Sequence, residues 1–386
     1  MRVGVVLIVL AGCGRIHFDP IGDAAGDTSV DGLPACTAAT PNRLDVLLIG
    51  GAMNQVSPTL SWLGVGQGYA MAYGDNATAN VITWYTRLDD TGSLVLGPVL
   101  VMSSGAGPDI VQVGNGLALT TVTATTNITL HEIALDGSAL APNTTVTTTS
   151  RASTAAAVAE RGGDIGVAWL QNSGSQPAFG TYRVDGTVVV APRPVGPTAD
   201  IHVDLAATST SWALTFHGVF GARPLSDLLL LRLGSDGAPI GMPGSVTGAT
   251  TSTTGTAVRG TIVSRGDRYA LAWSDSRGGD NAIYYTWLAA DGSVIQPPTR
   301  IAGTGATQEL ALGAGPRGTM LAWLEAGIMR ATWIDAPDVP PIDLSSVAIT
   351  TNTIGVAVGA DSAVVVWSDD RGGALDLRAA TLGCVE

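Results

Sequence analysis

One short pattern returns seven times along this chain and restricts its fold more than any other feature. Each copy has small and apolar residues alternating up to a residue that is usually aromatic, then a polar loop, a second alternating run and a tight turn. The copies align on Tyr69 to Tyr73, Leu117 to Thr121, Ile165 to Trp169, Trp212 to Phe216, Tyr269 to Trp273, Thr319 to Trp323 and Ala363 to Trp367, spaced 44 to 57 residues apart. Repeats of about 40 to 50 residues with only strand signals are typical of propeller blades. The sequence therefore predicts an all-β protein, a single seven-bladed β-propeller of four-stranded antiparallel blades.

The fifth copy shows how four strands fit into one repeat. Strands are expected at Thr256 to Ser264, Tyr269 to Ser274, Ile283 to Ala289 and Ser293 to Ile301. The turn between the third and fourth strands, Asp291-Gly292, recurs as Thr91-Gly92, Asp136-Gly137, Asp185-Gly186 and Asp236-Gly237. Glycine there supplies the positive φ that a tight hairpin needs. Paired aromatic and small residues in the second strands indicate sheets buried on both faces, so the tryptophans are expected in the core.

The seventh copy ends early and predicts how the ring closes. It stops after a third strand at Leu375 to Gly383, whereas an apolar strand at Arg43 to Gly51 precedes the first copy without a partner. Pairing this strand beside the last blade leaves no exposed sheet edge. The arrangement resembles the strand-exchange closure common in propellers, and it assigns residues 43–386 to the propeller.

Two cysteines flank the elements that would close the ring. Cys36 lies just before the closing strand and Cys384 lies at the end of the third strand of the last blade. Antiparallel neighbours put those two ends on the same rim, so a disulfide is expected, provided that the chain reaches an oxidising compartment. Two cysteines with no third ligand nearby do not predict a metal site.

The N-terminus carries an export signal. Arg2 precedes an apolar stretch from Val3 to Leu10, which is far shorter than the roughly 20 residues that span a bilayer. The stretch runs into Leu10-Ala11-Gly12-Cys13, which resembles the bacterial lipobox. The resemblance implies that residues 1–12 are a lipoprotein signal peptide and that Cys13 is lipidated and anchors the chain in a membrane. Gly14 in place of Asp favours the outer membrane, and an ordinary signal peptide or a buried strand is the alternative.

Residues 13–42 then form a predicted flexible tether. Asp19, Asp23, Asp27 and Asp31 are spaced among small residues and cannot bury enough apolar surface to fold alone. A calcium loop is the alternative, but no glutamate follows at the spacing of an EF-hand.

Composition excludes several partners and reactions. The formal net charge is -13, from 32 acidic and 19 basic residues, and all of the bases are arginine. An acidic surface repels phosphate backbones, which argues against nucleic acid and anionic lipid headgroups as partners. The lack of lysine removes Schiff-base chemistry and a P-loop.

Candidate binding residues lie on the loops between second and third strands. The fifth copy reads Trp273-Ser274-Asp275-Ser276-Arg277-Gly278-Gly279-Asp280 and the seventh reads Trp367-Ser368-Asp369-Asp370-Arg371-Gly372-Gly373. These loops resemble the Trp-Ser-Asp-x-Arg-Gly-Gly loops of repetitive propellers on bacterial surfaces, a group with no shared reaction. The candidate binding-face residues are Asp75, Asn76, Asp275, Arg277, Asp280, Glu325, Asp369, Asp370 and Arg371. Alternatively, Asp and Arg pair within each loop and make it rigid.

Motifs of known chemistry do not fit the chain. Sialidase-type Asp boxes place the tryptophan after the Ser-x-Asp, whereas these loops place it before. Gly-x-Ser-x-Gly elbows, tandem calcium loops and histidine pairs at metal-ligand spacing were not found in the sequence. We therefore assign no catalytic residue, metal or cofactor from the sequence.

Two functions remain compatible with the sequence. The first is a non-catalytic, monomeric lipoprotein of the bacterial cell envelope whose propeller is a platform for a protein or glycan partner. The alternative is an envelope enzyme, a glycosidase or lyase, that acts on a polysaccharide with loop carboxylates such as Asp275, Asp280, Asp369 or Glu325. Glycoside hydrolysis needs two carboxylates about 5 to 10 Å apart near the substrate.

Overall fold

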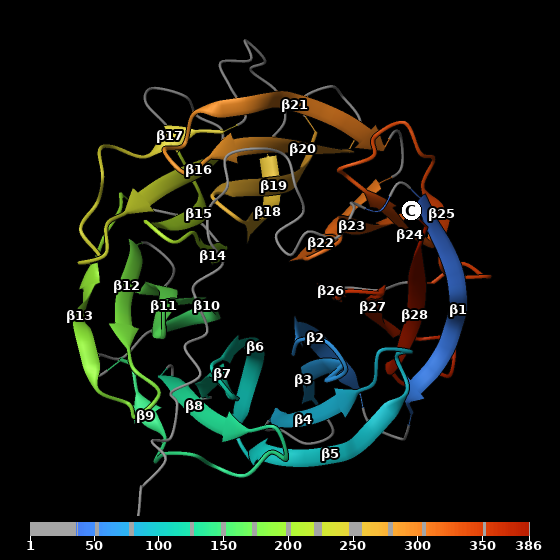
Figure 1. The fold of residues 1–386 in the computed structure, drawn as a ribbon, viewed down its shortest axis with the longest axis horizontal. Coiled ribbons are helices and arrows are strands. Elements are labelled where there is room, and N and C mark those ends of the chain that lie inside the picture. The colour runs from blue at the N-terminus through green and yellow to red at the C-terminus, as the bar shows by residue number, and fades with distance from the viewer. Residues whose placement is uncertain are drawn as a thin grey trace, which may run out of the picture.

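The protein is a ring of seven blades whose inner strands surround a common axis (Figure 1). A computed structural model describes residues 36, 38–50, 54–76, 81–123, 127–147, 152–171, 176–197, 202–219, 226–246, 257–276, 281–302, 306–349 and 353–385. These residues form seven four-stranded antiparallel sheets and no helix, which confirms the predicted fold. The described part of the chain therefore has no helix that is long and apolar enough to span a membrane. The signal peptide, Cys13 and most of the predicted tether lie outside the described residues.

Four concentric rings of strands make up the propeller. The innermost strands are β2 (Gln55–Trp62), β6 (Gly105–Val113), β10 (Ala152–Arg161), β14 (Val203–Ala207), β18 (Ala257–Arg265), β22 (Ala306–Gly315) and β26 (Ile354–Val358). The second strands are β3 (Tyr69–Asp75), β7 (Gly116–Thr123), β11 (Asp164–Gln171), β15 (Trp212–Val219), β19 (Arg268–Asp275), β23 (Gly318–Glu325) and β27 (Ser362–Asp369). The third strands are β4 (Ile82–Leu88), β8 (Ile128–Ala134), β12 (Gln176–Tyr182), β16 (Ser226–Leu233), β20 (Ala282–Ala289), β24 (Ile328–Trp333) and β28 (Asp376–Val385). The outer strands are β5 (Leu94–Met102), β9 (Thr144–Thr145), β13 (Val188–Pro194), β17 (Gly244–Ser245), β21 (Val294–Ala302), β25 (Ile342–Asp343) and β1 (Ala38–Ile49).

The core lies between neighbouring blades, on both faces of the second strands. Every residue of β3, β23 and β27 is buried. Trp273, Trp323 and Trp367 expose at most 1% of their surface, as the alternation of large and small residues predicts. Truncating one of these rings to alanine is expected to cost about 3 to 5 kcal/mol, since the cavity cannot collapse between two sheets.

The hairpins between third and fourth strands hold each blade against the preceding one. Their five predicted glycines have φ between +69° and +83°. The glycines are also close to the neighbouring blade: a Cβ on Gly137 would lie 2.9 Å from Val99, and one on Gly237 would lie 3.1 Å from Phe179. Glycine is therefore required by the backbone conformation and by the packing between blades.

Strand β1 closes the ring as predicted. It pairs antiparallel with β28 and completes the sheet β1-β28-β27-β26 (Figure 1). The strand begins at Ala38, five residues before the predicted start at Arg43, so the pairing takes in residues that we expected in the tether. The pairing extends this far because Ala39 lies opposite Cys384, next to the covalent link at Cys36.

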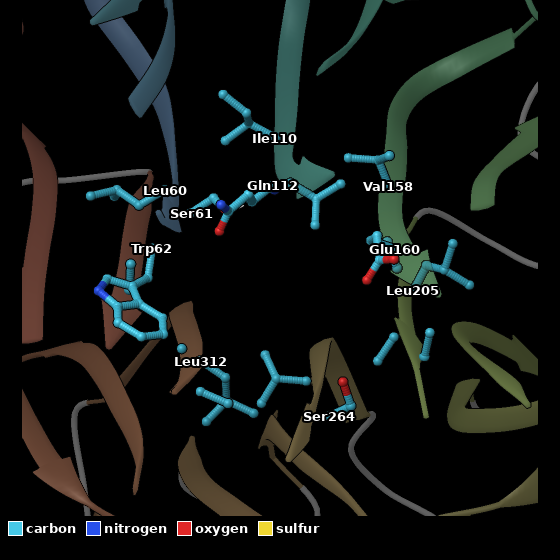
Figure 2. Close-up of a pocket in the computed structure, with 18 of the residues that line it drawn as sticks. Leu60, Ser61, Trp62, Ile110, Gln112, Val158, Glu160, Leu205, Ser264 and Leu312 are labelled. Carbon is cyan, nitrogen blue, oxygen red and sulfur yellow. Dashed lines mark hydrogen bonds between the residues drawn. The ribbon is translucent and has the colours of Figure 1, made fainter. Parts of the chain in front are cut away.

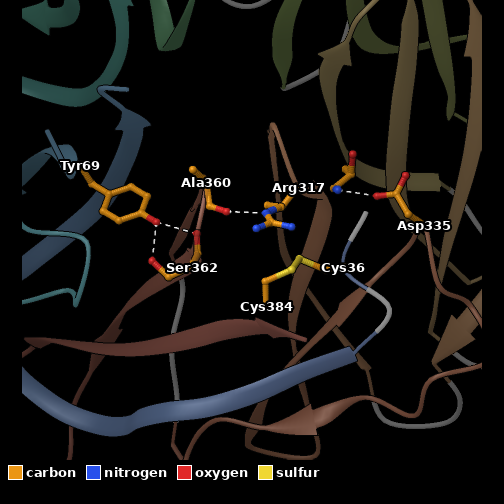
Figure 3. Close-up of a disulfide and its surroundings, with 8 residues drawn as sticks. Cys36, Tyr69, Arg317, Asp335, Ala360, Ser362 and Cys384 are labelled. Carbon is orange, nitrogen blue, oxygen red and sulfur yellow. Dashed lines mark hydrogen bonds between the residues drawn. A yellow bond between two sulfur atoms is a disulfide. The ribbon is translucent and has the colours of Figure 1, made fainter. Parts of the chain in front are cut away.

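The predicted disulfide joins Cys36 to Cys384, with 5.3 Å between their Cα atoms. Cys36 is buried, and its backbone N–H donates to the carbonyl of Arg317 in the sixth blade at 2.9 Å. The Arg317 guanidinium in turn donates from Nε to the carbonyl of Ala360 in the seventh blade at 2.7 Å (Figure 3). The disulfide therefore lies where the sixth and seventh blades meet.

The two faces of the ring carry different connections. We call the face with the loops between second and third strands the upper face, and the face with the hairpins between third and fourth strands the lower face. Strand β28 runs toward the lower face, so Cys36 and the start of β1 lie there. The inner strands line the channel from the upper to the lower face.

We predict that breaking the disulfide destabilises the native protein. The bond closes a loop with a sequence separation of 348 residues, for which the chain-entropy model gives about 6 kcal/mol as an upper value. Non-reducing peptide mapping should recover a cross-linked peptide with both cysteines. Denaturant unfolding of the Cys36→Ser/Cys384→Ser chain should show a lower midpoint than the oxidised chain. Two free thiols in the native protein would contradict the pairing.

Candidate functional site

The predicted acids at the ends of the second strands are buried on the upper face. Asp75, Asp275, Glu325 and Asp369 expose between 1% and 9% of their surface. Asn76 and Asp370 are exposed beside them. Arg277 and Asp280 lie outside the described residues, so the structure brings together only part of the predicted set.

In the seventh blade the loop residues form an ion-pair cluster. Arg371 donates from Nε to Asp369 Oδ2 at 2.7 Å and from Nη1 to Asp45 Oδ2 at 2.7 Å. Arg378 adds a bond of 3.3 Å from Nη1 to Asp45 Oδ1. Asp45 belongs to β1, so this cluster joins the loop to the strand that closes the ring. We refer to these four residues as the closure cluster.

Hydrogen bonds decide the charge state of Asp45. Burial by itself would raise the pKa of this carboxyl, but the bonds from Arg371 and Ser346 and the charge of Arg371 hold the pKa well below its ordinary value. The side chains of Asp45 and Asp369 expose only 10% and 1% of their surface. Both carboxylates are therefore occupied by arginine, which is the alternative arrangement that the sequence suggested for this loop. The same pairing in the fifth loop falls outside the described residues.

Other loop acids also have structural partners. Glu325 pairs with Arg330 of the next strand at 2.5 Å. The indole Nε1 of Trp323 donates to Glu325 at 3.4 Å, and that of Trp273 donates to Asp275 at the same distance. A tryptophan two residues before an acid thus holds the carboxylate at the end of the strand in both blades. These contacts fix the shape of the upper face.

The channel contains three cavities. An upper cavity of about 740 Å³ lies among the first halves of the inner strands, and a recess of about 190 Å³ opens beside it. A lower cavity of about 360 Å³ lies among the second halves, where Trp62, Gln112 and Glu160 reach inward (Figure 2). An apolar belt lies between the upper and lower cavities, and it consists of Leu60, Val158, Leu205, Ile262, Leu312 and Val356.

Two aspartates line the upper cavity, one on β6 and one on β14. Asp109 accepts from the Thr59 hydroxyl at 2.9 Å in the preceding blade and from the Val158 N–H at 2.7 Å in the following blade. Asp204 accepts from the Thr261 hydroxyl at 2.7 Å and from the Ile262 N–H at 2.9 Å in the following blade. Both carboxylates therefore tie neighbouring inner strands together where those strands have no ladder bonds to each other.

Burial disfavours the charged form of both channel aspartates. It raises the pKa of Asp109 to about 7, with a further contribution from the negative charge of Asp204. Burial also raises the pKa of Asp204, against the bonds from Ile262 and Thr261. The two acids therefore interact electrostatically across the cavity.

Sequence reasoning missed these two acids. An alignment of the inner strands would have revealed them, because they occupy one ring position that elsewhere holds the neutral residues Thr59, Ala157, Thr261, Ala311 and Gly355. The acids that we predicted belong to the ends of second strands and are absent from the walls of all three cavities. Across the described chain, no three His, Cys, Asp or Glu side chains are grouped to hold a metal ion.

Comparison with known proteins identifies the fold but no family. No protein-family profile matches this chain, and neither does the sequence of any curated protein. Among solved structures, a neuraminidase-like protein from A/bat/Guatemala superposes with a TM-score of 0.53 and 9% identity over 92% of this chain and 97% of that one. The α-L-arabinofuranosidase Arb93A from Fusarium graminearum gives 0.50 and 9% over 89% and 98%.

A puromycin hydrolase gives a TM-score of 0.52 and 14% identity over 83% of this chain. The chain spans about half the length of that hydrolase and of a prolyl endopeptidase that it also matches, at 51% and 46%. At such identities the likeness concerns the propeller fold alone.

We predict that Arg371→Gln destabilises the protein by roughly 2 to 3 kcal/mol, because it leaves Arg378 as the one arginine of the cluster that still contacts the two buried carboxylates. Asp343→Asn is the matched control. It removes one charge of the other ion-pair cluster and leaves the pair of Arg330 with the buried Glu325 in place; the Asp343 side chain is 61% exposed, so a loss of about 1 kcal/mol or less is expected. Denaturant unfolding of both variants measures the difference. Equal losses of stability in the two variants would show that the closure cluster contributes no more to stability than an exposed ion pair.

Proposed function

We propose that this protein is a non-catalytic lipoprotein of the bacterial cell envelope and that its propeller is a rigid platform for a protein or glycan partner. The observation that carries the proposal is the closure cluster. The upper-face loop with the most distinctive sequence uses its acid and its arginine to lock β1 onto the last blade. A face built from such clamped loops presents a fixed surface, and a pre-formed surface loses little conformational entropy on binding.

The path of the chain gives this platform an orientation. Residues before Cys36 lead into the ring at the lower face, where β1 begins. If Cys13 carries the lipid, the lower face is turned toward the membrane and the upper face is turned away from it. A tether of some twenty residues would let the upper face reach a partner in the envelope or outside it.

The anchor is tested by replacing Cys13. We predict that the wild-type chain fractionates with membranes and incorporates labelled palmitate, whereas Cys13→Ser does neither, because the thioether site is gone. The Cys36→Ser variant is the control for loss of a cysteine, and it should still be labelled. Membrane retention and labelling of Cys13→Ser would contradict the lipobox assignment.

The platform is tested by a binding screen of the full chain, purified in detergent, against glycan arrays and envelope proteins. We expect a glycan or protein ligand that is released unchanged. Replacing the exposed upper-face residues Asn76 and Asp370 by alanine should weaken its binding, whereas Asp236→Asn in a lower-face hairpin should leave binding unchanged. Turnover of a bound glycan would contradict the non-catalytic proposal and favour the polysaccharide-active alternative. Equal sensitivity of both faces would contradict the assignment of the upper face.

A further inference from the structure

The upper cavity has the size and the walls of a small-molecule site. Its volume of about 740 Å³ falls within the range of roughly 300 to 1,000 Å³ that is typical of ligand pockets. Apolar groups, among them Pro58, Pro108, Leu310 and Ile354, form much of its wall. It lies on the axis of the ring, where every blade contributes an inner strand, so its shape is set by the whole fold.

The charged groups of this cavity are acidic. Asp109 and Asp204 are held in place by donors from neighbouring blades, so their carboxylates are fixed before any ligand arrives. Among the described residues that line the cavity there is no arginine, and the whole chain lacks lysine. His202 on the cavity wall and Glu309 in the adjoining recess are the other titratable side chains there.

Two buried hydroxyls lie on the second strands directly behind the two acids, outside the cavity wall. Thr120 and Thr215 are the cross-strand partners of Asp109 and Asp204, and both are fully buried. Their Oγ1 atoms have no hydrogen-bond partner within the described structure. The other five blades have alanine or valine at this position: Ala72, Ala168, Ala272, Ala322 and Val366. At this position of the second strands, a polar side chain therefore occurs only behind the two acids, so the second and fourth blades differ from the other five in two successive strands.

A cation would correct the electrostatic imbalance of this site. Burial and mutual repulsion disfavour two negative charges in one cavity, and together they bring the pKa of Asp109 to about 7. A positive group between the carboxylates would restore the charged form of both. A bare metal ion fits poorly, because no third His, Cys, Asp or Glu side chain joins the two aspartates among the described residues and much of the wall is apolar. An ammonium group on a carbon skeleton matches the acids and the apolar wall together.

We propose that the upper cavity binds a small organic cation, an alkylamine or polyamine, whose ammonium group lies between Asp109 and Asp204 and whose carbon chain packs against the prolines and aliphatic side chains of the wall. The site rests on the inner strands alone. It depends neither on the lipid anchor nor on the upper-face platform, and it can exist whether or not those proposals hold.

Calorimetric titration of the full chain tests the site with four amine probes: 1,4-diaminobutane, spermidine, agmatine and n-butylamine. We expect at least one amine to bind, and the neutral 1,4-butanediol not to bind. Asp109→Asn and Asp204→Asn should each weaken the amine at least tenfold. Glu160→Gln, which changes a carboxylate of the lower cavity, should leave the affinity unchanged. Failure of all four amines at millimolar concentration, or equal binding of the diol, would overturn the proposal.

The pH dependence supplies a readout on the wild-type chain, which does not require the aspartate variants to fold. Binding of the cation requires a charged Asp109, so affinity for the amine should fall as the pH drops below about 7. Near pH 6.5, titrations in two buffers with different ionisation enthalpies should show that a proton is released on binding. His202→Gln should retain this release. Binding with no proton release in the wild type, or release that disappears only with His202, would contradict the placement of the ammonium between the aspartates.

Discussion

The pairing of β1 with β28 is the interaction on which the rest of this structure depends. The C-terminal repeat supplies three strands of the last blade, so without β1 this blade would lack its outer strand and the two ends of the chain would not share a sheet. A covalent bond and a cluster of ion pairs hold β1 in place. A disulfide secures its start at the lower face, and the closure cluster secures its upper half through Asp45. Arg43 extends the contact to Ser93 in the first blade, so the closing strand touches both of its neighbours along the ring.

This constraint explains why conspicuous loop residues are structural in the seventh blade. Acid and arginine at adjacent positions of a surface loop suggest a ligand site, yet here they meet an aspartate from the opposite end of the chain. The acids that the sequence pattern did not mark lie inside the channel. Asp109 and Asp204 connect inner strands of different blades and also place negative charge in a cavity, so the stability of the ring and the proposed ligand site depend on the same carboxylates.

Much of the architecture could be predicted from the sequence because almost every blade is built from one continuous stretch of the chain. Four strands, their turns and the aromatic at the end of the second strand recur within each stretch of about fifty residues, and Asp291-Gly292 marks a hairpin without reference to the rest of the chain. Ring closure was also predictable, since a strand without a partner, a repeat without its fourth strand and two cysteines beside them all indicate the same pairing. The closing strand begins earlier than predicted because its pairing extends to the disulfide. Asp45, Asp109 and Asp204 were missed because their partners lie in other blades or at the other end of the chain, and alternation within one strand carries no information about them.

Amide hydrogen exchange of the oxidised full chain tests the central claim most directly. If β1 is the outer strand of the last blade, the amides of Val46 to Ile49 that pair with β28 should exchange as slowly as amides of the outer strands β5 and β21, because all of them open only when a blade opens. The amides of β28 that face β1 and those that face β27 should both be protected from exchange. Exchange of β1 at the rate of an unstructured chain, with β28 protected only where it faces β27, would show that the ring is not closed by the N-terminal strand.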